Sequence, residues 1–225
     1  MWPRTNAKIS VNVRPRASRR QGNNPKSQYL VGLYYATKEN GELDYAEAAR
    51  WYLKAANSGY AQAQNKLANI LINGEDGVPQ DIEQAISLYT KAAQQGNAAA
   101  QFNLAWQYDT GRLIKQDNEK AIFWYTKAAE QSDSDAQFNL GNYYRIDDKI
   151  KNLKTAVFWY TKAAEQGNPD AQFNLGTCYK TGEGAVQDFG TAAYWYQKSA
   201  DQGNATAQNS LGNFYADGDG VEKIC

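Results

Sequence analysis

The chain has 225 residues and a formal net charge of zero. Its residues are 42% apolar and 13% aromatic, which is enough to form a buried core and excludes a wholly disordered protein. No apolar run is long enough to span a membrane, and the N-terminus lacks the uninterrupted apolar segment of a secretory signal. Two cysteines exclude a disulfide framework. We therefore expect a soluble, cytoplasmic protein.

The first 26 residues form a basic segment without an acidic residue, which leaves 17 basic against 24 acidic residues in the rest of the chain. Its basic residues are Arg4, Lys8, Arg14, Arg16, Arg19, Arg20 and Lys26. With three prolines and little apolar content, the segment cannot offset the entropy cost of folding, which predicts a disordered tail. It is either a solvated extension, an organelle import signal, or a site for nucleic acid or an anionic membrane.

Residues 27–225 repeat with a period of 35 to 37 residues. A tyrosine recurs at this spacing with an alanine four residues before it, at Tyr52, Tyr89, Tyr125, Tyr160 and Tyr196. An Ala-Gln pair recurs in the same steps. A fixed period of this size indicates an array of units that must stack on their neighbours, because each one is too small to fold alone.

Each unit predicts two helices, which we name A and B. The apolar residues of one A helix are Ala136, Leu140, Gly141 and Tyr144, and those of one B helix are Ala121, Trp124, Tyr125 and Ala128, both in helical spacing. The link from A to B varies in length, and it ends at Asp44, Asp81, Asp117 and Asp188, which predicts N-caps for the B helices. We therefore expect five helix pairs and a lone sixth A helix over residues 27–225.

Residues 168–203 carry this pattern most fully, with AQFNLGTCY, the loop TGEGAVQD, and AAYWYQKSADQG. The pattern resembles the Sel-one-like repeat, a relative of the tetratricopeptide repeat. The resemblance implies an all-α fold, a right-handed α-α superhelix of antiparallel helix pairs. It also implies a scaffold or adaptor that binds proteins on the concave side, which is lined by the A helices.

Small residues and a glutamine recur on the predicted buried side of helix A. Gly32, Gly141, Gly176 and Gly212 should let neighbouring helices approach closely, as should Ala68 and Ala105 in the other units. The glutamines are Gln28, Gln64, Gln101, Gln137, Gln172 and Gln208. Because a buried amide needs partners, we expect these side chains to form hydrogen bonds between helices or between repeats.

Two nearly identical stretches differ at the joint between repeats, KAAEQGNPDAQFNLG at 162–176 and KAAEQSDSDAQFNLG at 127–141. Gly167 suits the left-handed conformation that ends helix B, and Asn168 suits the cap of the next A helix. In the other copy Asp133 keeps the cap, but Ser132 replaces the glycine, at a cost of about 1 kcal/mol if the same geometry is kept. This predicts a weaker or differently angled joint there.

The chain contains no histidine, which excludes histidine-dependent nucleophiles and histidine-ligated zinc. Two distant cysteines cannot supply a four-ligand zinc site, and no loop has the ending of a phosphate-binding motif. The acidic DGDG stretch at 217–220 lacks the ligand spacing of a calcium loop. We therefore expect no catalytic residues, no metal, no cofactor and no small-molecule substrate.

Positions that vary between units are available for a particular partner, whereas identical positions should serve stacking. On helix A, three positions point away from the predicted buried stripe, at two, six and nine residues after the first alanine. The candidate partner-binding residues there are Tyr29, Phe102, Trp106, Phe138, Asn142, Arg145, Phe173, Thr177 and Lys180. Either the phenylalanines are exposed anchors for a protein or peptide ligand, or they pack against the next repeat.

The chain stops at DGVEKIC, where a sixth B helix should begin. The last A helix therefore lacks its mate, and solenoid ends normally carry a polar cap. We expect either that the chain is a fragment of a longer array or that this helix pairs with another molecule.

Overall fold

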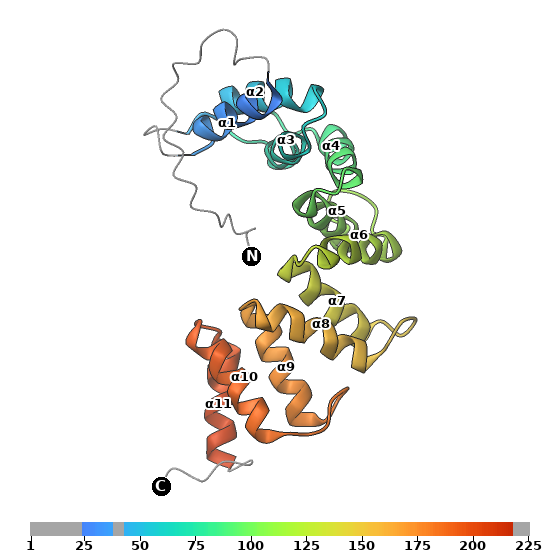
Figure 1. The fold of residues 1–225 in the computed structure, drawn as a ribbon, viewed down its shortest axis with the longest axis vertical. Coiled ribbons are helices and arrows are strands. Elements are labelled where there is room, and N and C mark those ends of the chain that lie inside the picture. Colours follow the sequence, from blue (N-terminus) through green and yellow to red (C-terminus); the bar gives the residue numbers. More distant parts are fainter. Residues whose placement is uncertain (1–23, 38–42, 218–225) are drawn as a thin grey trace. The chain divides into compact units, whose positions relative to one another are not determined.

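The computed structural model describes residues 24–37 and 43–217, and there the chain forms eleven helices joined by turns, with no strand (Figure 1). The helices are α1 (Pro25–Tyr35), α2 (Tyr45–Asn57), α3 (Ala61–Asn73), α4 (Ile82–Gln94), α5 (Ala98–Thr110), α6 (Asn118–Glu130), α7 (Ser134–Ile146), α8 (Leu153–Glu165), α9 (Pro169–Thr181), α10 (Phe189–Asp201) and α11 (Ala205–Asp217). The predicted all-α fold is confirmed. None of these helices is long and apolar enough to cross a membrane.

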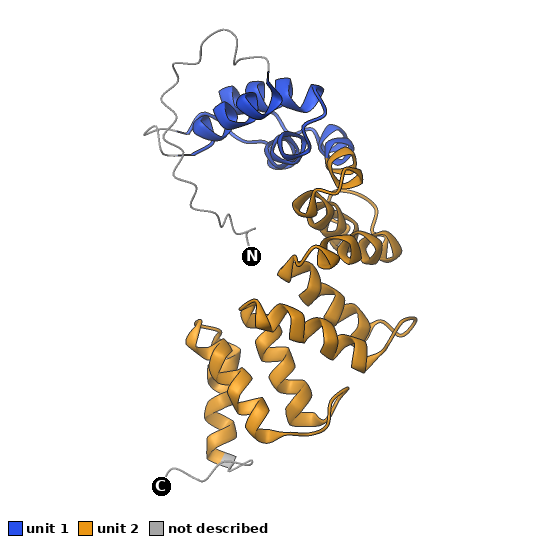
Figure 2. Ribbon diagram, in the orientation of Figure 1, with its two compact units in different colours: residues 1–88 blue, residues 89–225 orange. Residues whose placement is uncertain are grey.

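The helices belong to two compact units, which are described separately (Figure 2). The first unit ends at Leu88, inside α4, and the second begins at Tyr89. In the second unit the A helices α5, α7 and α9 pack against the B helices α6, α8 and α10 that follow them. Each B helix also packs against the next A helix, up to α11. Short turns join these neighbours, so successive helices run in opposite directions, as predicted for A–B pairs.

The first helix begins two residues before the start expected for the repeats. Pro25 occupies its first turn, and the Asn24 side chain accepts a hydrogen bond from the Lys26 backbone N–H at 2.9 Å. A capping asparagine followed by proline is a favourable helix start, which is why the helix includes residues assigned to the tail. The rest of the predicted tail, residues 1–23, lies outside the described residues, as do residues 218–225 with most of the DGDG stretch.

The predicted caps of the B helices are confirmed. Asp44, Asp81, Asp117 and Asp188 each accept a hydrogen bond from the backbone N–H three residues later, at 2.9 to 3.0 Å. Asn152, which replaces the aspartate in the shortened link, makes the same bond to Thr155 at 3.0 Å. The links therefore vary in length, but each of these B helices starts in the same way.

The recurring glutamine of helix A joins two successive B helices. The Gln137 side chain donates to the Ala129 carbonyl of α6 at 3.1 Å and accepts from Gln166, at the end of α8, at 2.7 Å. Gln101 and Gln172 repeat this arrangement one unit earlier and one unit later. The predicted hydrogen bonds are confirmed, and they hold the C-terminal ends of α6, α8 and α10 side by side.

The small residues of helix A make room for the recurring tyrosine of helix B. Tyr125 and Tyr160 are completely buried, and Tyr52 and Tyr196 are at least 97% buried. A Cβ atom added at Gly141 would lie 2.5 Å from two ring carbons of Tyr160. This distance is far below van der Waals contact, so the close approach expected at this glycine is confirmed. The same expectation is wrong at Gly212, where an added Cβ atom would have no atom within 4 Å, because no B helix follows α11 among the described residues.

The two joints have the same geometry despite their different residues. Gly167 has φ +89°, and Ser132 has φ +68°, the one described non-glycine residue with a positive φ. The caps that follow are also equal, because Asp133 and Asn168 each accept from the N–H three residues later at 2.9 Å. Ser132 therefore adopts the same left-handed conformation as Gly167, at the steric cost of its Cβ atom.

Candidate protein-binding site

The predicted site residues lie on four A helices. Tyr29 is on α1 in the first unit, where its ring contacts those of Tyr52 and Tyr60 at centroid distances of 5.8 and 5.4 Å. The other eight are on α5, α7 and α9 of the second unit, two on α5 and three on each of the others. We call the surface of these three helices that carries them the A-helix face.

Three phenylalanines, Phe102, Phe138 and Phe173, form a row on this face, which we call the A-helix row. Each ring is half-buried and packs against the buried tyrosine of the B helix that follows, at centroid distances of 5.7, 6.2 and 5.6 Å. Phe138 also packs against the buried cluster formed by α8 and α9. The rings are therefore covered on one side and open on the other. This arrangement combines the two alternatives stated above, exposed anchors for a ligand and packing within the array.

The polar site residues hold the hydroxyl groups of these tyrosines. The Tyr160 hydroxyl donates to Asn142 Oδ1 at 2.7 Å and accepts from Arg145 Nε at 3.1 Å. The Thr177 and Tyr196 hydroxyls are hydrogen-bonded at 3.1 Å. Burial raises the pKa of Tyr160, and the Arg145 charge opposes that rise. Asn142 and Thr177 thus satisfy buried groups of their own repeat, as a buried hydroxyl requires.

Asp109 takes this role in the preceding repeat. Its carboxylate accepts from the Tyr125 hydroxyl at 3.1 Å and from the Tyr143 hydroxyl at 2.5 Å. Burial and this carboxylate raise the pKa of Tyr143. The bond from Tyr143 joins α7 to α5, and a bond from Asn174 to Asn142 at 3.2 Å joins α9 to α7. The three A helices therefore form one continuous face.

Two side chains of this face have exposed surface or polar atoms left for a partner. Trp106 is 40% exposed, the highest exposure among the predicted aromatic residues. Arg145 uses Nε for Tyr160 and forms no ion pair with any carboxylate of the described residues. Lys180 lies with its ammonium 5.4 Å from the Phe214 ring. Trp106 and Arg145 are therefore the strongest candidates for direct contact with a partner.

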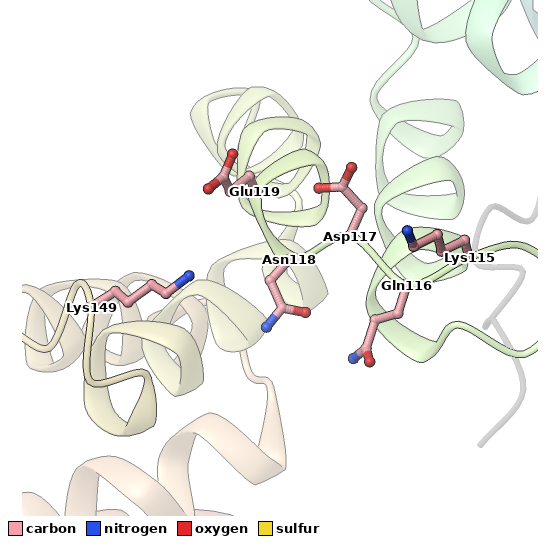
Figure 3. Close-up of a pocket in the computed structure, with 6 residues that line it drawn as sticks. All are labelled: Lys115, Gln116, Asp117, Asn118, Glu119 and Lys149. Carbon is pink, nitrogen blue, oxygen red and sulfur yellow. The ribbon is translucent and has the colours of Figure 1, made fainter.

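A shallow pocket of about 450 Å³ lies away from these residues, at the link before α6 (Figure 3). It is lined by Lys115, Gln116, Asp117, Asn118, Glu119 and Lys149. Asp117 is already engaged, as the cap of α6 and in an ion pair with Lys120 at 3.0 Å. Its bonds to the Lys120 backbone and side chain lower its pKa. The lining is polar and mixed in charge, unlike the mostly apolar lining of small-molecule sites.

The Sel1 repeat family model matches residues 25–60, 61–97, 98–133, 134–168, 169–204 and 205–223, which together span nearly all the described residues. The chain belongs to the Sel1 repeat family. Sel1 repeat proteins are in general non-catalytic scaffolds that bind other proteins. The resemblance inferred from the sequence is therefore confirmed, as are the helix pairs on which it rested.

Solved structures of Sel1 repeat proteins are similar over most of this chain. A protective antigen of uropathogenic Escherichia coli with an SLR fold is 37% identical, with a TM-score of 0.82 over 91% of this chain and 44% of that one. A Sel1 repeat protein from Oxalobacter formigenes is 34% identical, with a TM-score of 0.79 over 92% of this chain and 82% of that one. The chain thus spans less than half of the E. coli antigen.

The Sel1 repeats of the second unit carry a further aromatic set that sequence reasoning missed. Phe123, Phe158 and Tyr194 are 52%, 51% and 53% exposed on α6, α8 and α10. We call them the B-helix row. The signal was available, because each residue follows the buried alanine of its helix by two positions and so lies off the buried stripe. The earlier units have Arg50 and Ser87 at this position.

Proposed function

We propose that this Sel1 repeat protein is a non-enzymatic scaffold that binds a peptide or a partner domain along the A-helix face of its second unit. The observation that carries the proposal is a half-open row of phenylalanines beside Trp106 and Arg145. Aromatic and arginine side chains supply most of the binding energy in typical protein interfaces. A continuous row on adjacent helices offers them to one extended ligand.

The hydrogen bonds of this face divide its residues into two kinds. Asn142 and Thr177 are engaged by Tyr160 and Tyr196, so they fix the shape of the face. Trp106 and the outer nitrogens of Arg145 are not engaged by a tyrosine hydroxyl or a carboxylate within the described residues. Specificity for a partner would therefore come from the second kind, in agreement with their difference from the corresponding residues of other repeats.

The proposal is tested with a double variant, Trp106→Ala with Arg145→Gln, in which glutamine keeps a donor for the Tyr160 hydroxyl. The intact chain is used to capture a partner from cells of its source, and the affinity of the purified partner is then measured by titration calorimetry. We expect at least a tenfold loss of affinity in the variant. A matched control is Leu113→Ala with Lys149→Gln, since Leu113 is 39% exposed and Lys149 is also exposed.

Unchanged affinity in the double variant would contradict the proposal. A partner held instead by the basic tail, such as nucleic acid or an anionic membrane, would be lost when residues 1–23 are deleted and would show strong salt dependence. The deletion must stop at residue 23, because Asn24 caps α1 and Pro25 begins it. The two variants therefore separate binding by the repeats from binding by the tail.

A further inference from the structure

The B-helix row presents three aromatic rings at equivalent places on three neighbouring helices. Phe123, Phe158 and Tyr194 keep about half of their surface in solvent, although each is a large apolar side chain. Contiguous exposed apolar residues on a protein surface mark interaction sites more often than isolated ones do.

Each ring of the row stands on a tryptophan that is anchored in the core. Phe158 and Trp159 meet edge to face with centroids 5.0 Å apart, and Tyr194 and Trp195 do so at 5.0 Å. Trp159 packs against the buried cluster formed by α5, α6 and α7, and Trp195 packs against the buried cluster formed by α8 and α9. The exposed rings are therefore held in place from below, which lowers the entropy cost of using them in binding.

The three helices present this row on one surface. The C-terminal ends of α6 and α8 are joined through Gln137, and those of α8 and α10 through Gln172. Since every member of the row occupies the same position of its helix, the rings follow one another along the array at the period of the repeat. An elongated partner could therefore contact several of them at once.

The charges next to the row are mainly positive. Within one helical turn of the three rings lie five lysines and one acidic residue, namely Lys120, Lys127, Lys154, Lys162, Lys198 and Glu119. Lys120 and Lys127 already form ion pairs with Asp117 and Glu130, at 3.0 and 3.4 Å. The Lys162 and Lys198 ammonium groups lie 5.8 and 5.7 Å from the rings of Phe158 and Tyr194. Each of these two repeats therefore offers an apolar ring and an ammonium group side by side.

We propose that the B-helix row and its lysines form a second docking surface, for an acidic polypeptide segment that carries apolar side chains. The rings accept the apolar side chains, and the ammonium group four residues later pairs with a neighbouring carboxylate. This surface is on the B helices, so it is independent of the binding proposed for the A-helix face.

Nucleic acid is the less favourable occupant of this surface. Residues 89–217 contain 12 basic and 14 acidic residues, so this unit has no excess positive charge to attract a phosphate backbone. Glu130, Glu165 and Asp201 also follow the row two helical turns later. Isolated lysines beside apolar rings suit the dispersed carboxylates of a polypeptide better than the continuous charge of a nucleic acid.

The test uses the full chain and a fluorescein-labelled peptide of repeated Glu-Phe-Asp-Leu-Gly units, with binding followed by fluorescence anisotropy. Two comparison peptides replace the acidic residues with lysine or the apolar residues with glycine. We expect the acidic, apolar peptide to bind and both comparison peptides to bind at least tenfold more weakly. Phe158→Ala with Tyr194→Ala, and separately Lys162→Glu with Lys198→Glu, should each weaken binding of the first peptide at least tenfold.

The matched control is Ile146→Ala with Val186→Ala, which removes apolar side chains that are 62% and 87% exposed outside the row. It should bind the peptide as the intact chain does, and so should Trp106→Ala. Circular dichroism checks that every variant stays folded. The proposal is overturned if the acidic, apolar peptide does not bind, if the lysine peptide binds equally, if the row variants bind normally, or if an oligothymidylate displaces the peptide from the row.

Discussion

The A-helix row and the B-helix row have the same period and the same place relative to the buried stripe, yet they meet different surroundings. Phe138 follows the buried Ala136 by two residues, and Phe158 follows the buried Ala156 by two residues. Phe138 is half-buried against Tyr160, whereas Phe158 is 51% exposed. A residue type that recurs at the same position therefore has the same role in each repeat, but the recurrence does not show whether that role is packing or recognition.

The difference arises from what each helix has beside it. An A helix has a B helix before it and another after it in the chain, and the later one supplies a tyrosine ring against which the phenylalanine rests. On the B helices no ring of another described helix pairs with the residue at this offset. It contacts the adjacent tryptophan of its own helix and, at Phe158 and Tyr194, a lysine ammonium group. Packing thus separates two rows that helical periodicity treats alike.

The largest effect on the free energy of unfolding is expected at the buried tyrosines of the B helices. Tyr160→Ala removes a completely buried ring that supports Phe138, and it should lower the free energy of unfolding by about 3–5 kcal/mol. Tyr194→Ala removes a ring that is 53% exposed on α10 and should change it by about 0.5 kcal/mol. Urea denaturation followed by circular dichroism measures both. Equal losses would show that exposure does not distinguish these positions.

Replacing one phenylalanine in each row should change the free energy of unfolding in the same direction, by a smaller amount. Phe138→Ala is expected to lower the free energy of unfolding by about 2 kcal/mol, because its half-buried ring loses contact with Tyr160. Phe158→Ala should cost less than about 1 kcal/mol. The same urea titrations report the difference. A larger loss for Phe158 would mean that the B-helix row stabilises the array.

Tyrosine hydroxyls give a finer comparison between the repeats. Tyr160→Phe leaves Asn142 and Arg145 without this partner and should cost about 1–1.5 kcal/mol. Tyr52→Phe should be neutral or slightly stabilising, because the buried Tyr52 hydroxyl has no hydrogen bond within the described residues. The A-helix positions that supply partners elsewhere are Leu33 and Ala36 in its repeat. A clear loss in Tyr52→Phe would reveal a partner there.

The smallest effect is expected at the joints on which both rows depend. Ser132→Gly should raise the free energy of unfolding by about 1 kcal/mol, because glycine adopts φ +68° without a Cβ clash. Gly167→Ser, at φ +89°, should lower it by a similar amount. Thermal unfolding of the two variants gives the sign directly. If Ser132→Gly were destabilising, the serine hydroxyl would contribute more than its backbone strain costs.

Most of the fold was predictable from local patterns. The period predicted the repeats, the helical spacing predicted the A and B helices, and the residue types of Asp133 and Asn168 predicted caps that their hydrogen bonds confirm. The predicted start of α1 is two residues late, because the repeat pattern begins at residue 27 whereas the capping Asn24 and Pro25 lie in the basic segment before it. These features depend on neighbours in sequence, and they are therefore readable from sequence.

The candidate site was predictable only in part. The sequence identified the positions that vary between repeats, but it treated Asn142 and Thr177 as available to a partner, whereas each contacts a tyrosine 18 or 19 residues away. It also passed over Phe158, whose exposure depends on the absence of a covering ring. Such contacts join residues from different helices, so their identity follows from how the helices pack.

The repeat unit, its two helices, their caps and the glutamine that needed partners follow from the amino-acid sequence, because the period and the helical spacing require them. Which aromatic row is covered and which is open depends on how the helices pack. The physical reason is that each helix presents the same residue types at the same offset, and a neighbouring ring, supplied from the next helix in the stack, buries one row and leaves the other in solvent.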